Sequence, residues 1–205
     1  MYGGMTSTER AEDRRSRMLD AALDLMGSPE LGPPTVRKVL SRSGVAPRYF
    51  YDHFTDLDEL QLAVFAMLAA EAEQVGTAAM LAAPRRTAAR TRAGLAALAD
   101  LLLDDPRKGR VLVVEPLRSP VLGPAYATQL RRFASLLANY SPAVWRGENP
   151  ESRAVLVTTQ FALGGFAATM TAVLTGELPD DRKRLVDELT ALFLGVGSTF
   201  RRLSP

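Results

Sequence analysis

The stretch from Thr35 to Leu60 constrains the fold of this chain more than any other. It reads TVRKVLSRSGVAPRYFYDHFTDLDEL. Gly44 supplies the permissive backbone that lets a helix end and the chain reverse direction. Pro47 then stands where a new helix begins, a position at which its missing N–H costs nothing. Two short helices joined by such a turn, followed by a long helix from about Asp56, are typical of a helix-turn-helix.

Apolar side chains recur along most of the chain at three- and four-residue spacings, which is the helical period. They include Met18 and Leu25 in the first helix, and Phe50 and Phe54 in the third. No stretch alternates polar and apolar residues with period two, as a half-buried strand would. The run Val111–Val114 has the composition of a buried strand, but it has no partner strand, so we predict a short helix there. The chain is therefore predicted to be all-α.

Capping residues and helix breakers divide the chain into about nine helices. Thr6 and Glu9 have the spacing of a capping box, and Thr35 is a favourable N-cap for the second helix. Pro84 ends the long helix that begins near Asp56. The expected helices span approximately residues 6–26, 35–43, 47–54, 56–81, 85–103, 107–123, 124–139, 150–176 and 180–202.

The composition excludes several classes of chemistry. None of the 205 residues is a cysteine, so disulfides, thiolate metal sites and cysteine nucleophiles are absent. A single histidine, with no carboxylate pair or glycine-rich phosphate loop at meaningful spacing, argues against a helical enzyme. The net charge is only +2, so any basic surface must come from the arrangement of charges. We recognise no signal peptide or apolar run of transmembrane length, and expect a soluble, cytoplasmic protein.

Residues 14–62 resemble the DNA-binding region of the tetracycline-repressor (TetR) family of bacterial transcription factors. The residues that carry this resemblance are the valine-rich helix after Thr35, Ser43-Gly44-Val45 at the turn, Tyr51, His53, Phe54, Asp58 and Leu60. Residues 161–196, FALGGFAATMTAVLTGELPDDRKRLVDELTALFLGV, resemble the family's last two helices and the short link between them. The resemblance implies a helix-turn-helix DNA-binding domain at residues 1–56 and an effector-binding and dimerisation domain at residues 57–205.

The resemblance also implies DNA contacts from the start of the second helix and along the third. The implied residues are Thr35, Arg37, Pro47, Arg48, Tyr49, Tyr51 and His53. In the major groove, Arg48 is expected to read guanine, and Tyr49 to touch a thymine methyl group. Thr35 and Arg37 are expected to contact the backbone and set the register. The alternative is that Tyr49 and Tyr51 are partly buried aromatic residues and that Arg48 is a solvated charge.

Two positions depart from the family pattern. Leu57 stands where the family commonly has a lysine that meets a phosphate, and Ala46 where it commonly has a hydroxyl cap. Peptide N–H groups at the helix start can still bind phosphate, but we expect one phosphate contact fewer per subunit. The resemblance implies that His53 supports a phosphate contact, but a structural hydrogen bond is an equally good interpretation of this residue. The arginines of the first helix are interpreted as an ordinary solvated face, with at most one near a phosphate.

The last two helices are expected to form a homodimer interface. Such a dimer would place two recognition helices about 34–36 Å apart on a near-palindromic operator. The implied interface residues are Phe161, Gly165, Phe166, Leu185, Leu189, Leu192, Phe193 and Val196. The alternative is that the apolar stripe on the last helix belongs to the core of its own chain.

The central helices, residues 84–140, are expected to enclose an effector pocket together with parts of their neighbours. The candidate lining residues are Phe65, Leu68, Leu98, Leu102, Glu115, Tyr126, Phe133 and Met170, and for each of them plain packing is the alternative. Few charged groups fall on the predicted core side, so we expect an apolar or aromatic effector that releases a repressor from DNA. The competing hypothesis is a ligand-independent DNA-binding protein that acts architecturally or through a protein partner. We expect no cofactor, metal ion or membrane among the partners.

Overall fold

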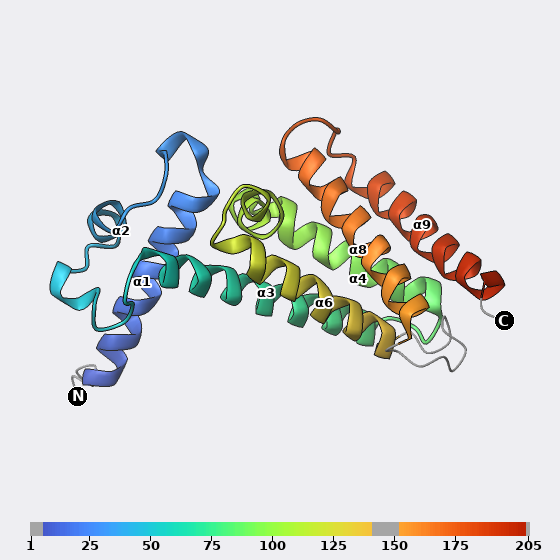
Figure 1. Ribbon diagram of the computed structural model, residues 1–205, viewed down its shortest axis with the longest axis horizontal. Helices are drawn as coiled ribbons and strands as arrows, with labels where there is room; N and C mark the ends of the chain where they lie inside the picture. Colours follow the sequence, from blue (N-terminus) through green and yellow to red (C-terminus); the bar gives the residue numbers. More distant parts are fainter. Residues whose placement is uncertain (1–5, 141–151, 204–205) are drawn as a thin grey trace.

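The computed structural model describes residues 6–140 and 152–203, and within these ranges the chain is helical without a strand (Figure 1). The α-helices are α1 (Ser7–Gly27), α2 (Val36–Ser43), α3 (Leu57–Ala82), α4 (Thr87–Asp104), α5 (Pro106–Gly109), α6 (Leu122–Tyr140), α8 (Arg153–Leu174) and α9 (Arg182–Leu203). Shorter helical turns are η1 (Pro29–Leu31), η2 (Pro47–Tyr49), η3 (Arg110–Val114) and η4 (Glu115–Leu117). The all-α prediction is confirmed.

Local sequence signals position the N-terminal helices as expected. Thr6 and Glu9 form the predicted capping box: the Thr6 hydroxyl accepts from the Glu9 N–H, and the Glu9 carboxylate accepts from the Thr6 N–H. This last hydrogen bond lowers the pKa of Glu9. Thr35 caps α2, where its hydroxyl accepts from the Lys38 N–H at 3.2 Å. Met18 is fully buried on the inner face of α1.

The predicted third helix is shorter than expected. Only Pro47–Tyr49 form a 3₁₀ turn, and hydrogen-bonded turns carry the chain from there to Phe54. Ala46 precedes this turn and has no side-chain oxygen to cap it. Packing therefore has to hold the segment in place, and the buried rings of Phe50 and Phe54 do so, with their centroids 5.9 Å apart. We refer to residues 46–54 as the recognition turn.

The run Val111–Val114 is the buried middle of the molecule. It forms η3, a π-helical turn, so the prediction of a helix rather than a strand is confirmed. The hydroxyl of Thr171 on α8 lies between two carbonyl acceptors, that of Ala167 in its own helix at 2.9 Å and that of Val113 at 3.1 Å. The contact with Val113 gives one of the irregular turn's backbone groups a partner outside the turn.

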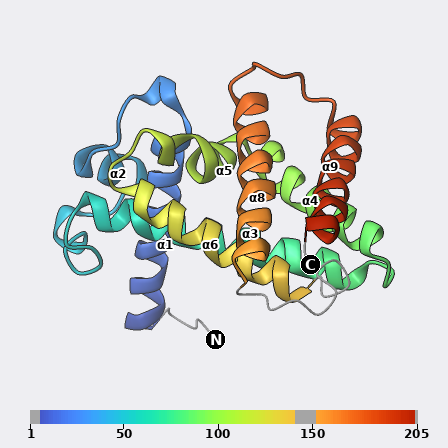
Figure 2. The same cartoon turned by 45° about the vertical axis from the view of Figure 1, so that its right-hand side comes forward.

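Helix α3 runs from the N-terminal helices deep into the rest of the chain (Figure 1). Asp56 caps it by accepting from the Glu59 N–H at 2.8 Å, and its buried face begins at Leu60. Helix α4 crosses α3 closely, because a Cβ on Gly94 would lie 2.8 Å from Met80 Cγ. Helices α8 and α9 run side by side at the end opposite α2, and Figure 2 shows them as a pair.

Two described helices, α3 and α8, are long and apolar enough to cross a membrane by length and composition, which the sequence did not lead us to expect. Core helices of soluble proteins pass the same test. About a third of the apolar window of each helix is buried within the chain, where α3 contacts α4 and α6, and α8 contacts α6 and α9.

Candidate nucleic-acid interface and effector cavity

The chain reverses direction after α2, before the recognition turn begins, and this reversal depends on Gly44. Gly44 has φ of 65°, in the left-handed region, and its N–H donates to the Leu40 carbonyl at 3.0 Å. A side chain other than glycine would strain the backbone at this φ, so the turn favours glycine. Arg17 on α1 donates to the Ser43 carbonyl at the end of α2.

Arginines of α1 hold the recognition turn, which the sequence interpretation did not foresee. Arg14 places its guanidinium 4.3 Å from the centroid of the Tyr49 ring, and Arg15 lies 5.4 Å from that of Phe54. Together with Arg17 these contacts orient the turn on α1. Arg15 and Arg17 are exposed, as a solvated face requires, but the sequence did not predict their contacts, because pairing across helices cannot be read from residue spacing within one helix.

The structure separates the seven predicted DNA-contact residues into two groups. Thr35, Arg37, Pro47, Arg48 and Tyr51 are exposed, and 70% of Tyr51 is accessible. The other two, Tyr49 and His53, are partly buried.

Each of these two partly buried side chains has a distinct environment. Arg48 lies against the Tyr49 ring and donates to its hydroxyl at 2.8 Å. Tyr49 thus lies under two guanidinium groups and supports the turn. His53 Nε2 is buried, and no described group is within hydrogen-bond reach of it.

Lys38 does not contribute a free charge to this surface. Its ammonium donates to the Leu31 carbonyl at 2.7 Å and to the Pro33 carbonyl at 3.0 Å, so it fixes the loop before α2. Arg48 is exposed on the turn itself, Arg37 is exposed on α2, and the exposed Arg15 and Arg17 reach this region from α1, so the cations available to a polyanion come from three segments.

Leu57 is half-buried at the first position of α3 and packs on the core. Replacing Leu57 with lysine should add one phosphate contact per subunit, because a lysine stem can cover the same apolar surface while its ammonium reaches solvent. The slope of log K against log salt concentration should steepen by roughly 0.9 per subunit. Binding of DNA measured across a potassium chloride series tests this. Leu62→Lys, on the same helix, is the control, and an unchanged slope in Leu57→Lys would contradict the expectation.

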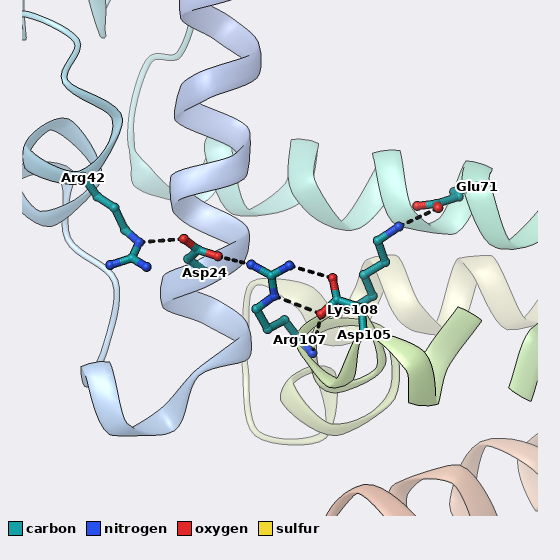
Figure 3. Close-up of polar contacts among 6 residues, drawn as sticks. All are labelled: Asp24, Arg42, Glu71, Asp105, Arg107 and Lys108. Carbon is teal, nitrogen blue, oxygen red and sulfur yellow. Dashed lines mark hydrogen bonds and ion pairs between the residues drawn. The ribbon is translucent and has the colours of Figure 1, made fainter. Parts of the chain in front are cut away.

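Asp24 on α1 is the centre of an ion-pair network that joins three helices (Figure 3). Its carboxylate accepts from Arg42 Nε on α2 at 2.7 Å and also pairs with Arg107 on α5. Asp105 holds the same Arg107 at 2.7 Å. Burial tends to raise the pKa of Asp24, but hydrogen bonds from the two guanidinium groups outweigh it and the pKa is lowered. Hydrogen bonds from Arg107 likewise lower the pKa of Asp105.

Helix α5 is wedged between α1 and α4. A Cβ on Gly27 would lie 2.5 Å from Arg107 Cα, and a Cβ on Gly109 would lie 2.2 Å from the Leu102 carbonyl oxygen. Lys108 adds an ion pair of 2.6 Å to Glu71 on α3 (Figure 3). Close packing and ion pairs therefore join α5 to α1, α3 and α4.

Asp24→Asn should lower the free energy of unfolding by about 1–3 kcal/mol, because hydrogen bonds to a charged group are lost. The folded pKa of Asp24 lies below its unfolded value, so its contribution is present above pH about 4 and is lost as the pH falls through the folded pKa. Urea unfolding from pH 3 to 8 measures the difference. Asp20→Asn, exposed on the same helix, is the control. A difference that did not shrink below pH about 4 would contradict this assignment.

A cavity of about 100 Å³ lies among α3, α4, α6, α8 and α9. It is lined by Glu73, Gly76, Thr77, Met80, Thr91, Gly94, Leu95, Leu98, Phe133, Leu136, Leu137, Thr158, Thr159, Ala162, Leu163, Phe166, Phe193, Leu194 and Val196. Two of the eight predicted effector residues, Leu98 and Phe133, belong to this wall. The others do not: Phe65, Leu68, Leu102 and Met170 are buried in the core, and Tyr126 is partly buried.

Two of the predicted effector residues outside the cavity are polar. Glu115 forms an ion pair with Arg110 at 3.4 Å. Burial raises the pKa of Tyr126. The wall residues that sequence reasoning missed include Glu73 and Thr77 on α3 and Thr91 on α4. They follow the same helical period as the core stripe, so their spacing alone carries no signal for a cavity.

The predicted interface residues also divide between two environments. Phe161 on α8 and Leu192 on α9 are 71% and 63% exposed, an unusual exposure for large apolar side chains. Gly165 lies on the same exposed side of α8, with open space where a Cβ would be. Phe166, Leu185 and Leu189 are instead buried within the chain, whereas Phe193 and Val196 line the cavity.

The fold is that of TetR-family transcriptional regulators. A putative TetR-family regulator from Syntrophomonas wolfei has a TM-score of 0.74 at 13% identity over 91% of this chain and 96% of that one. The regulator FadR from Bacillus subtilis, in complex with stearoyl-CoA, has a TM-score of 0.72 at 17% identity over 87% and 97%. The multidrug binding protein EbrR, complexed with imidazole, has a TM-score of 0.63 at 22% identity over 87% and 94%. No protein-family model matches the sequence.

Proposed function

We propose that this protein is a cytoplasmic, homodimeric transcriptional repressor that leaves a near-palindromic operator when a small apolar or aromatic ligand binds. Residues 1–56 would form the DNA-binding domain, and residues 57–205 the effector-binding and dimerisation domain. The observation that carries the proposal is the recognition turn. Its buried Phe50 and Phe54 fix a short element that presents Pro47, Arg48 and Tyr51 to solvent. An exposed aromatic and arginine surface on a rigid support suits base edges in a major groove.

The dimer part of the proposal rests on the outer face of α8 and α9. Phe161 and Leu192 are exposed there, and Val157 on α8 is 58% exposed. An exposed apolar patch on paired helices favours association with a second copy, and two-fold symmetry lets the same patch serve both subunits. Small residues such as Gly165 permit the helices of the two subunits to approach closely.

The ligand part rests on the cavity. At about 100 Å³ the cavity is smaller than the roughly 300–1,000 Å³ that is usual for a site that binds a drug-sized ligand. Ligand binding would therefore have to part the surrounding helices. The C-terminal end of α4 leads directly into α5 and the Asp24 network. A ligand that binds the parted state more tightly would shift the equilibrium toward that state, to an extent set by its differential affinity for the two states. In the proposal, α1 and α2 are positioned differently in the parted state.

The alternative is a DNA-binding protein without an effector, and the small cavity favours it. The two proposals differ in one result. Purified protein is titrated against labelled DNA flanking its own gene, first alone and then with a panel of small apolar and aromatic compounds. If a compound weakens the binding of DNA at least tenfold, the ligand-responsive repressor is supported. Binding that no compound changes supports the alternative, and failure to prefer any DNA sequence contradicts both.

A further inference from the structure

The cavity wall has an unusual chemistry for a purely apolar site. Of the nineteen described residues that line it, one is charged, and that one is an acid, Glu73 on α3. Three others are phenylalanines from three different helices: Phe133 on α6, Phe166 on α8 and Phe193 on α9. No lysine or arginine belongs to this lining. The remaining wall is made of aliphatic side chains, glycines and threonines.

Aromatic rings and a carboxylate attract the same kind of ligand. The face of an aromatic ring carries negative potential and binds cations, and cages of several rings recognise quaternary ammonium groups. A carboxylate in the same wall adds a formal negative charge in a partly desolvated place. An anionic ligand, in contrast, would meet one negative charge and no positive one in the described wall.

Glu73 already has a partner, but that partner is exchangeable. Arg132 on α6 contacts the two carboxylate oxygens at 2.9 and 3.1 Å. The Glu73 side chain is 22% exposed, whereas 65% of the Arg132 side chain is in solvent. A ligand cation inside the cavity can replace Arg132 if it supplies contacts comparable to this two-point ion pair. The displaced guanidinium then returns to water.

We infer that the cavity binds a small organic cation, with an ammonium group held by Glu73 and the rings of Phe133, Phe166 and Phe193. This inference rests on the proposed function only in taking the cavity as the effector site. It narrows the effector class from apolar or aromatic ligands to ligands that combine an apolar body with a positive charge. The Glu73–Arg132 pair, which joins α3 to α6, would open as such a ligand enters.

Three small molecules that share a trimethyl or tert-butyl group test the charge preference on the full-length protein. They are choline, its neutral carbon isostere 3,3-dimethylbutan-1-ol and the anion 3,3-dimethylbutanoate. Isothermal titration should show choline binding about tenfold more tightly than the neutral isostere, the scale expected for a partly desolvated cation beside aromatic rings. The anion should bind most weakly. Equal affinities, tighter binding of the anion, or no binding of choline at millimolar concentration would overturn the inference.

Two variants show whether the named residues are responsible. Glu73→Gln keeps the shape and an acceptor for Arg132, and should reduce the preference for choline over its isostere to within about twofold. Phe133→Leu keeps an apolar wall but removes the ring. It should weaken the binding of choline more than the binding of the neutral isostere. Glu71→Gln removes a neighbouring acid on the same helix that does not line the cavity, and should leave the preference unchanged. A preference retained in Glu73→Gln would place the cation elsewhere.

The same samples separate this inference from the proposed function. If choline shows the expected preference but leaves operator affinity unchanged, the cation site stands and the ligand-responsive repressor is wrong. If the neutral isostere binds as tightly as choline and releases the operator, the repressor stands and the cation site is wrong. Operator affinity measured with each of the three compounds therefore completes the test.

Discussion

The Arg48→Ala variant should bind its operator between about thirtyfold and more than a thousandfold more weakly than the unaltered protein. A bidentate arginine–guanine contact contributes about 1–3 kcal/mol of discrimination, and a symmetric dimer would lose two of them. In the free protein Arg48 donates to the Tyr49 hydroxyl, so it must leave that partner to reach a base. This exchange is inexpensive, since Arg48 is exposed and surface contacts of this kind contribute about 1 kcal/mol or less.

Affinity for the operator and for a scrambled duplex should be measured together. A base-reading residue changes the first far more than the second, whereas a phosphate contact weakens both. Arg153→Ala, which removes an exposed arginine at the start of α8, is the charge-matched control. Circular dichroism shows whether the fold survives. If folded Arg48→Ala bound the operator as tightly as the unaltered protein, the recognition turn would not be the base-reading element.

The second large effect concerns association. Leu192→Arg should convert the protein to monomers, with a mass of 22.2 kDa by light scattering. Leu192 is 63% exposed in the single chain, so the substitution creates no cavity and leaves the fold intact. In the proposed interface it would bury two unpaired guanidinium groups near a two-fold axis, at a cost of several kcal/mol. Operator binding would fall with dimerisation, because one subunit reads only half of the site.

Leu117→Arg is a closely matched control, since Leu117 is 62% exposed on η4, which packs on η3 and α6. It should remain dimeric. Phe161→Arg is a second substitution that should disrupt the proposed interface, in this case from α8. Persistence of the dimer in both Leu192→Arg and Phe161→Arg would contradict an interface on the outer face of these helices.

The fold could be predicted largely because its signals are local. Thr6 and Thr35 cap helices through residues three positions away, and Gly44 meets a backbone requirement of its own turn. The spacing of Phe50 and Phe54 likewise indicates which side of the recognition turn is buried. Each of these signals is complete within a few residues, so no knowledge of the tertiary arrangement is needed to interpret it.

The parts that escaped prediction depend on contacts between distant segments. Arg14 contacts Tyr49, and Asp24 joins two arginines, one of which is 83 positions away. The cavity has the same origin, since its acid on α3 and its rings on α6, α8 and α9 meet only after the helices pack. An apolar stripe on a helix shows that its side is covered, but not whether a helix, a second subunit or a ligand covers it. Leu185 and Leu189 illustrate this, because they were assigned to a dimer interface and lie buried within their own chain.

Footprinting tests the central claim, that two recognition turns held by one dimer read DNA. Hydroxyl radicals are used to cleave the DNA that flanks the gene, in the presence of either the unaltered protein or Arg48→Ala. The unaltered protein should protect two patches centred about 34–36 Å apart, one turn of the duplex, on a near-palindromic sequence. Arg48→Ala should lose both patches at the same concentration. A single protected patch, uniform protection without sequence preference, or protection retained in Arg48→Ala would contradict the claim.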